Sequence, residues 1–134
     1  MRLDEIKRLL KAEVCSRTYD PHLLVRGAAA ADLMSDVLTF SRAGALLLTG
    51  LINPQVVRTA EVASIAAVVF VRGKCPPEET IRLAEENGLP LLITPFTLFT
   101  ACGRLHAAGL RGCEDIPGED RDAEPGEVPI GSAE

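Results

Sequence analysis

The chain has 134 residues, of which 47% are hydrophobic, and it contains one Tyr, four Phe and no Trp. This length allows one domain with a buried core and is too short for two ordinary domains. A core without Trp must be filled mainly by Leu, Val, Ile and Ala, which is usual for a parallel sheet covered by helices. The formal net charge is −5, and no basic stripe or aromatic stacking platform is present, which argues against a nucleic-acid partner.

The sequence also argues against a membrane or extracellular location. Its longest apolar run, AGALLLTGLI, is about half of the roughly 20 residues that a membrane-spanning helix needs. The first ten residues, MRLDEIKRLL, are amphipathic and charged where a signal peptide would be apolar. Four scattered cysteines without a C-x-x-C pair favour reduced thiols over a disulfide framework or a zinc site. We therefore expect a cytoplasmic protein.

The first 44 residues predict two helices around an irregular segment. Apolar residues recur at helical spacing from Leu3 to Leu10, with two acids in the first turn, which predicts a first helix. The segment EVCSRTYDPHLLVRG has no helical period and contains Asp20-Pro21, so it predicts one or two short strands around a turn. The segment AADLMSDVLTF has one apolar and one polar face, which predicts a short second helix.

Strands and helices then alternate regularly. Buried strands are predicted over 45–49, 66–71 and 90–93, and amphipathic helices over 54–62, 77–87 and 97–108. Asn53-Pro54 is a typical helix start, and Asn87-Gly88 is a typical left-handed helix end. Such alternation is typical of βαβ units, whose right-handed crossovers place the strands in parallel. The predicted fold is a single small α/β domain, with three α/β/α layers around a mostly parallel sheet.

The end of the chain differs from the rest in composition. Residues 111–134 hold eight acids and two arginines, and the segment is rich in Pro and Gly. Such a segment has little apolar material to bury, which predicts disorder. We therefore divide the chain into a domain over 1–110 and an acidic disordered tail over 111–134.

Polar residues follow each of the three predicted strands. Ligands of open parallel sheets bind at the carboxyl ends of the strands, where glycines, hydroxyls, cations and helix N-termini can hold an anion. The predicted binding residues, for a phosphorylated small molecule, are Thr49, Gly50, Asn53, Arg72, Gly73, Lys74, Thr94 and Thr97. A simpler interpretation stays open, in which these residues only end strands, cap helices and turn the chain.

The sequence contains no pattern that predicts catalysis. The phosphate-binding pattern G-x-x-x-x-G-K-[ST] is absent, and neither His22 nor His106 has a neighbour at triad or metal-ligand spacing. Cys75 lies beside Lys74 near a helix start, which is one setting for a reactive thiol, but no base accompanies it. We predict no catalytic residue, no metal site and no cofactor.

Three charged residues have two interpretations each. Asp32 and Asp36 lie four residues apart, which predicts a solvated helix face, and Asp32 is also a candidate helix cap. Paired carboxylates can also hold a metal or act as acid and base. Arg58 pairs either with an acid such as Asp36 or with a partner.

The stretch ADLMSDVLTF, LLLTGLINPQVVRTAEV, VVFVRGKCPPEETIRLAEENGLPLLITPFTLFTACGRLHAAGL resembles a stand-alone DRTGG domain over residues 24–110. DRTGG domains are similar to the N-terminal, non-kinase domain of HPr kinase/phosphorylase. The resemblance implies a three-layer α/β/α fold without an established activity. Family members occur fused to phosphotransacetylase or to CBS-domain proteins, or are encoded near iron-only hydrogenase components. Where the family name refers to Asp-Arg and Thr-Gly-Gly, this chain has LIN at 51–53 and RGK at 72–74.

Two functions follow as hypotheses. The first is a non-catalytic regulatory, ligand-sensing or assembly module that forms homo-oligomers and is associated with an anaerobic redox, hydrogenase-type protein system. Apolar residues of the last predicted helix, Leu98, Phe99, Cys102 and Leu105, are candidates for the oligomer interface, or pack only within the domain. The alternative is an HPr-kinase-like phosphotransfer enzyme or an accessory subunit of one, which would need a general base or magnesium.

Overall fold

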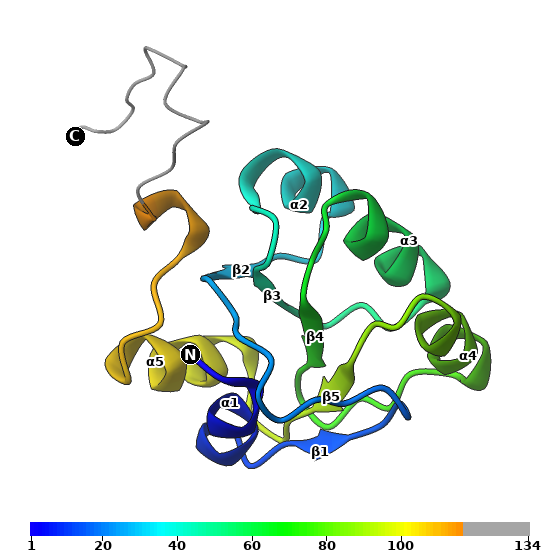
Figure 1. The fold of residues 1–134 in the computed structure, drawn as a ribbon, viewed down its shortest axis with the longest axis horizontal. Helices are drawn as coiled ribbons and strands as arrows, with labels where there is room; N and C mark the ends of the chain where they lie inside the picture. The colour runs from blue at the N-terminus through cyan, green and yellow to red at the C-terminus, as the bar shows by residue number, and fades with distance from the viewer. Residues whose placement is uncertain (117–134) are drawn as a thin grey trace.

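The computed structural model describes residues 1–116, which form a small α/β domain (Figure 1). The strands are β1 Glu13–Val14, β2 Ala28–Ala30, β3 Leu46–Thr49, β4 Ala67–Phe70 and β5 Leu91–Ile93. The helices are α1 Leu3–Leu9, α2 Met34–Phe40, α3 Pro54–Val62, α4 Glu78–Glu86 and α5 Leu98–Ala107, followed by a 3-10 turn, η1 Cys113–Asp115.

These strands form a five-stranded sheet in the order β1-β5-β4-β3-β2. Strands β2 to β5 are parallel to one another, and β1 pairs antiparallel with β5. Leu46 and Leu47 of β3 pair with Ala67 and Val68 of β4, so the two central strands run in register. All eight residues of these two strands are buried, because helices cover both faces of the sheet.

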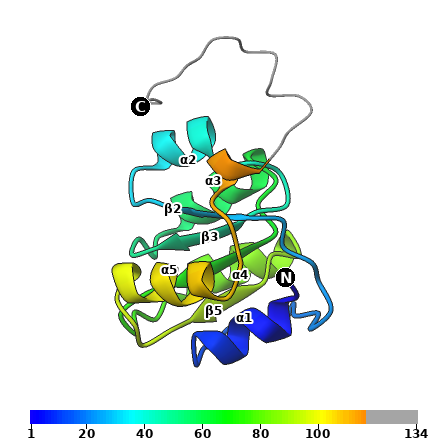
Figure 2. The same cartoon turned by 90° about the vertical axis from the view of Figure 1, so that its left-hand side faces the viewer.

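Helices lie on both sides of the sheet, which gives three layers (Figure 2). On one side, α1 and α5 cover a face to which the sheet contributes Leu46, Leu48 and Val69. On the other side, α2, α3 and α4 cover a face that includes Leu47 and Val68. Successive residues of a strand point to opposite faces, so each central strand supplies both cores. This arrangement confirms the predicted three-layer fold with a mostly parallel sheet.

The regular middle of the chain matches its predicted elements closely. Helix α3 has the predicted bounds, with Asn53 at its N-cap position and Pro54 in the first turn. The other strands and helices after residue 44 lie within their predicted ranges and are shorter by one or two residues at their ends. The predicted left-handed end of α4 is confirmed by Gly88, whose φ is 67°.

The first third of the chain differs from its prediction in one respect. The alanine-rich segment Ala28–Ala30 forms the edge strand β2, which the sequence did not indicate because alanine is a strong helix former. Pairing with Leu46, Leu47 and Leu48 of β3 outweighs this preference. Tertiary context therefore decides the structure of this segment.

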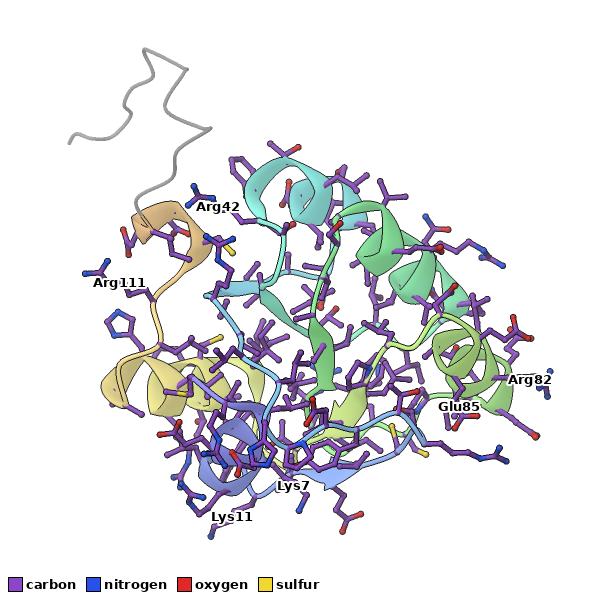
Figure 3. The ribbon with its side chains drawn as sticks, in the orientation of Figure 1. Lys7, Lys11, Arg42, Arg82, Glu85 and Arg111 are labelled. Atoms are coloured by element: carbon purple, nitrogen blue, oxygen red, sulfur yellow. The ribbon has the colours of Figure 1, made fainter. Side chains whose placement is uncertain are left out.

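The expected start of the acidic tail at residue 111 is too early. Ala28 N donates to Arg111 O at 2.9 Å, and Gly112 forms a parallel bridge with Ala28. Cys113 is buried, and Arg42 donates to Ile116 O at 2.6 Å. Figure 3 shows Arg42, in the loop after α2, directed toward this segment. Residues up to 116 thus belong to the domain, whereas the rest of the predicted tail lies outside the described residues.

Over residues 1–116, every helix is too short or too polar to cross a bilayer.

Candidate functional site

The end of β3 is held by a carboxylate from the segment that follows β2. Asp32 Oδ1 accepts a hydrogen bond from Thr49 Oγ1 at 3.0 Å and another from Gly50 N at 2.8 Å. Thr49 Oγ1 also accepts from Leu51 N at 3.1 Å, and the side chain of Thr49 is fully buried. These predicted anion donors are therefore already bound to a carboxylate of the protein itself.

This position of Asp32 corrects its predicted role. Helix α2 begins at Met34 with Leu33 as its N-cap residue, so Asp32 and Asp36 do not share a helix face. Asp32 instead accepts hydrogen bonds from Thr49 and Gly50 at the end of the neighbouring strand β3, and both residues are far from it in sequence. The sequence did not predict the contact of Asp32 with Thr49 and Gly50. This contact exists because β2 and β3 are neighbours in the sheet, and strand order cannot be read from a local pattern.

A tight turn follows β4 and carries two consecutive residues in the left-handed region. Arg72 has a φ of 60° and Gly73 a φ of 65°, and Lys74 N donates to Val71 O at 3.2 Å, as in a type I′ turn. Glycine adopts this conformation without cost, whereas a residue such as arginine loses about 1 kcal/mol or more.

The loop after β5 fixes this turn. Arg72 N donates to Phe96 O at 2.7 Å, and Gly73 N donates to Thr94 O at 2.8 Å. The N–H groups of both left-handed residues are thus used by one neighbouring loop. Strained backbone of this kind persists only where the surrounding structure holds it, and it is common at functional sites.

Two cationic side chains from this turn meet at Gly50. A methyl group added at Gly50 would lie 3.2 and 3.4 Å from the terminal nitrogens of Arg72, so the guanidinium group lies directly over this glycine. Lys74 Nζ donates to Gly50 O at 3.0 Å. Within residues 1–116, neither side chain forms a salt bridge, and the side chain of Arg72 is exposed. Gly50 therefore marks the centre of a site with two cationic side chains that form no salt bridge with a carboxylate of residues 1–116.

The remaining predicted residues are arranged differently. Thr94 is fully buried, and its hydroxyl donates to Leu10 O at 2.6 Å, so it connects β5 to the end of α1 instead of facing a crevice. Thr97 caps α5 by accepting from Thr100 N at 3.5 Å. Asn53 is exposed at the start of α3, and its side chain forms no cap hydrogen bond. The structure thus brings Thr49, Gly50, Arg72, Gly73 and Lys74 together, and uses Thr94 and Thr97 within the fold. Asn53 follows Gly50 by three residues in sequence.

The other candidate residues form no second cluster. Among the described residues, no group of three or more His, Cys, Asp or Glu side chains is arranged to hold a metal ion, and Arg58 forms no salt bridge with Asp36. Cys75 is exposed, whereas Cys15 is half-buried. Burial, together with Coulombic contributions from Cys75 and Glu85, raises the pKa of Cys15 to about 11, so this thiol stays protonated at neutral pH.

The fold of this chain is similar to that of a solved structure. The chain is similar to a structure described as the CBS and DRTGG domains of the regulatory region of Clostridium perfringens pyrophosphatase complexed with activator, diadenosine tetraphosphate. The TM-score is 0.65 at 20% sequence identity, and the match covers 89% of this chain and 51% of that one. This chain thus spans about half the length of the solved chain. No family model and no curated protein matches the sequence.

At this level of identity, the match shows a shared fold and supports a DRTGG-like architecture. It does not extend to the HPr kinase similarity that the sequence resemblance implied.

Proposed function

We propose that this protein is a non-catalytic, ligand-sensing regulatory module that binds a phosphorylated small molecule around Gly50. The observation that carries the proposal is the position of Arg72, which is held in a strained left-handed turn with its charged group over Gly50. A merely connecting turn would be served better by glycine or asparagine at this position. Arginine is the side chain best suited to phosphate, because its planar group donates two parallel hydrogen bonds.

The charges around Gly50 suggest what kind of ligand fits. Lys74 uses one of its three ammonium donors on Gly50 O and keeps two, and Asn53, three residues after Gly50, is exposed. Asp32 uses one oxygen for Thr49 and Gly50, which leaves Oδ2 without a hydrogen bond in residues 1–116. Asp32, Arg72 and Lys74 thus all lie against Gly50, and this combination of charges suits a ligand that carries both hydroxyl groups and phosphate, such as a nucleotide. The activator named for the similar pyrophosphatase region, diadenosine tetraphosphate, is of this class.

The hydrogen bonds of Asp32 favour a structural role for this carboxylate over that of a catalytic base. Its Oδ1 accepts from both the Thr49 hydroxyl and the Gly50 N–H, and so holds the end of β3 in place. A phosphotransfer enzyme needs a positioned base or a magnesium ion next to the transferred group. Binding without turnover is therefore the function that this arrangement supports better than the alternative of an HPr-kinase-like enzyme.

A regulatory module acts through contact with another protein, and ligand binding must change that contact. We extend the proposal to a homo-oligomer or a contact with a redox-system protein of the hydrogenase type. Phe99 on α5 is 88% exposed, which supports α5 as the contacting surface, whereas Leu105 of the same helix is buried in the domain. Sedimentation velocity of the wild type and of Phe99→Ser, with and without nucleotide, tests this part separately.

The central test is calorimetric titration with ATP, AMP, diadenosine tetraphosphate and acetyl phosphate, followed by analysis of the recovered compounds. We expect one of them to bind and to be recovered unchanged. At 100 times its Kd, such a ligand should stabilise the protein by about 2.7 kcal/mol, a shift of several degrees in Tm. Conversion of the compound would support the enzyme alternative instead.

Paired variants locate the site. The double variant Arg72→Ala, Lys74→Ala should lose binding, because both charges at Gly50 are removed. The matched control Arg58→Ala, Arg82→Ala removes two exposed cations from α3 and α4 and should bind as the wild type does. Equal binding by both double variants would show that the ligand site lies elsewhere.

A further inference from the structure

A pocket of about 600 Å³ lies at the β2 edge of the sheet, and none of the residues of the Gly50 site is among those that line it. Its floor is formed by Ala28–Ala31, and its walls include Phe40 from α2 and Gly103 and His106 from α5. Figures 1 and 2 show β2 between these two helices at the end of the sheet. The volume is in the range typical of sites for small organic ligands.

Small residues create this space. Four consecutive alanines form the floor, and a methyl group added at Gly103 would meet no atom within 4 Å outside its own helix backbone and chain neighbours. Phe40, which lines the pocket, is 63% exposed although it is a large aromatic residue. An aromatic wall above a flat alanine floor suits a planar ring, since ring stacking gains about 1 kcal/mol beyond the buried area.

The backbone of β2 offers a hydrogen-bond donor and acceptor in this pocket. Ala31 N donates inward to Leu48 O of β3, whereas Ala28 N donates outward to Arg111 O. Backbone groups of alternate residues in a strand point the same way, so Ala30 directs its N–H and C=O outward with Ala28. No strand lies beyond β2 within residues 1–116, and Ala30 is exposed and lines the pocket. A ring with an acceptor next to an amino group can pair with both groups of Ala30.

The charged residues of the pocket are acidic. Asp36 and Glu114 line it together with His106, and no Lys or Arg is among its described lining residues. Carboxylates accept hydrogen bonds from amino and hydroxyl groups and repel phosphate. The pocket is therefore suited to an uncharged ligand, in contrast to the cationic site at Gly50.

We propose that this pocket binds a nucleoside with an adenine-like base, whose amino group and neighbouring ring nitrogen pair with Ala30. The base lies on the alanine floor next to Phe40, and the acidic residues accept from the sugar hydroxyls. This site is independent of the phosphate-binding function proposed above.

Calorimetric titration with adenosine tests this proposal. We expect adenosine to bind, and purine riboside, which lacks the amino group, to bind at least tenfold more weakly. The variant Gly103→Leu fills the pocket and should abolish adenosine binding, while Tm stays equal or rises because glycine is a weak helix former. The matched control Ala107→Leu adds the same side chain at an exposed position of α5 that does not line the pocket, and should bind as the wild type does.

The outcomes separate the two sites. Gly103→Leu should retain any phosphorylated ligand found for the Gly50 site, whereas the Arg72→Ala, Lys74→Ala variant should retain adenosine. The proposal is overturned if adenosine at millimolar concentration produces no heat, or if Gly103→Leu binds it unchanged. It is also overturned if sedimentation shows a dimer that Gly103→Leu dissociates while adenosine does not bind, because the pocket would then be an interface between two copies.

Discussion

Two regions of this domain satisfy their backbone groups in opposite ways. At Gly50, the N–H donates to Asp32 and the carbonyl accepts from Lys74, so both polar groups of the strand end are used inside the protein. At Ala30, which lines a pocket, the alternation along β2 directs the corresponding groups away from β3. A ligand at the first region must therefore bind through unpaired side-chain charges, whereas one at the second can bind through the backbone itself. Polar residues in a loop thus do not by themselves indicate free binding groups.

The largest effect on stability is expected at Thr94, which the sequence predicted to bind a ligand and which the structure buries within the fold. Thr94→Val should lower the free energy of unfolding by about 2 kcal/mol, because Leu10 O and Phe96 N lose the hydroxyl that pairs with them in a buried setting. Ligand binding at Gly50 should not change. Urea denaturation and calorimetry on the same variant measure both quantities.

The matched control is Thr100→Val, which makes the same replacement at an exposed position of α5. It should change stability by less than about 0.5 kcal/mol. If Thr94→Val were as stable as this control and lost ligand, Thr94 would belong to the binding site after all.

A smaller effect of opposite sign is expected at Arg72. Arg72→Gly should raise the free energy of unfolding by about 0.5 kcal/mol, because glycine adopts the left-handed conformation without strain. The same change should weaken phosphate binding, so the variant gains stability and loses function.

Ser64→Gly provides the comparison for this prediction. Ser64 also has a positive φ, 56°, and lies in the turn after α3, where it does not contact Gly50. The Ser64→Gly variant should gain a similar free energy of unfolding, and its ligand binding should not change. A loss of stability in Arg72→Gly would mean that the arginine side chain contributes to folding and that its strain has no connection with a ligand.

The last effect is absent at neutral pH and concerns stability at alkaline pH. Because burial raises the folded-state pKa of Cys15 from 9.0 to about 11, the folded protein retains this proton more strongly than the unfolded chain does. The resulting stability is fully present below pH 9 and is lost as pH rises from 9 to 11. In Cys15→Ala, the alkaline loss of Tm over this range should be smaller than in the wild type. Cys75→Ala removes an exposed thiol that also raises the pKa of Cys15, but burial is the larger cause, so this variant should keep most of the wild-type slope. An identical slope in the wild type and in Cys15→Ala would contradict the prediction.

Sequence patterns predicted the parts of the fold that depend on local chemistry. Strands β3, β4 and β5 appear as short apolar runs, and their helices have clear starts and ends, such as Pro54 and Gly88. Such signals need no knowledge of distant residues. The positions of Thr49, Gly50, Arg72 and Lys74 at one edge followed from the same reasoning, because parallel strands end together.

The contacts that sequence reasoning missed are all between distant segments. The alanines of β2 form a strand only because β3 lies beside them. Asp32 accepts a hydrogen bond from Gly50 N only because β2 and β3 are neighbours in the sheet. The direction of the Thr94 hydroxyl depends on where α1 ends. None of these has a local signature, since an alanine run, a single acid and a single threonine occur equally well in helices, caps and turns.

The pairing of the sheet edges has a consequence for the order of folding. At one edge β1 pairs with β5, and at the other Ala28 pairs with Gly112, so each edge joins segments from near opposite ends of the described chain. Closing such long loops costs chain entropy before any contact compensates for it. During synthesis, β3 and β4 can associate early, whereas β2 gains its outer neighbour only once residue 112 has been made. We therefore expect both edges to form last and to open first, with amide exchange faster there than in the central strands.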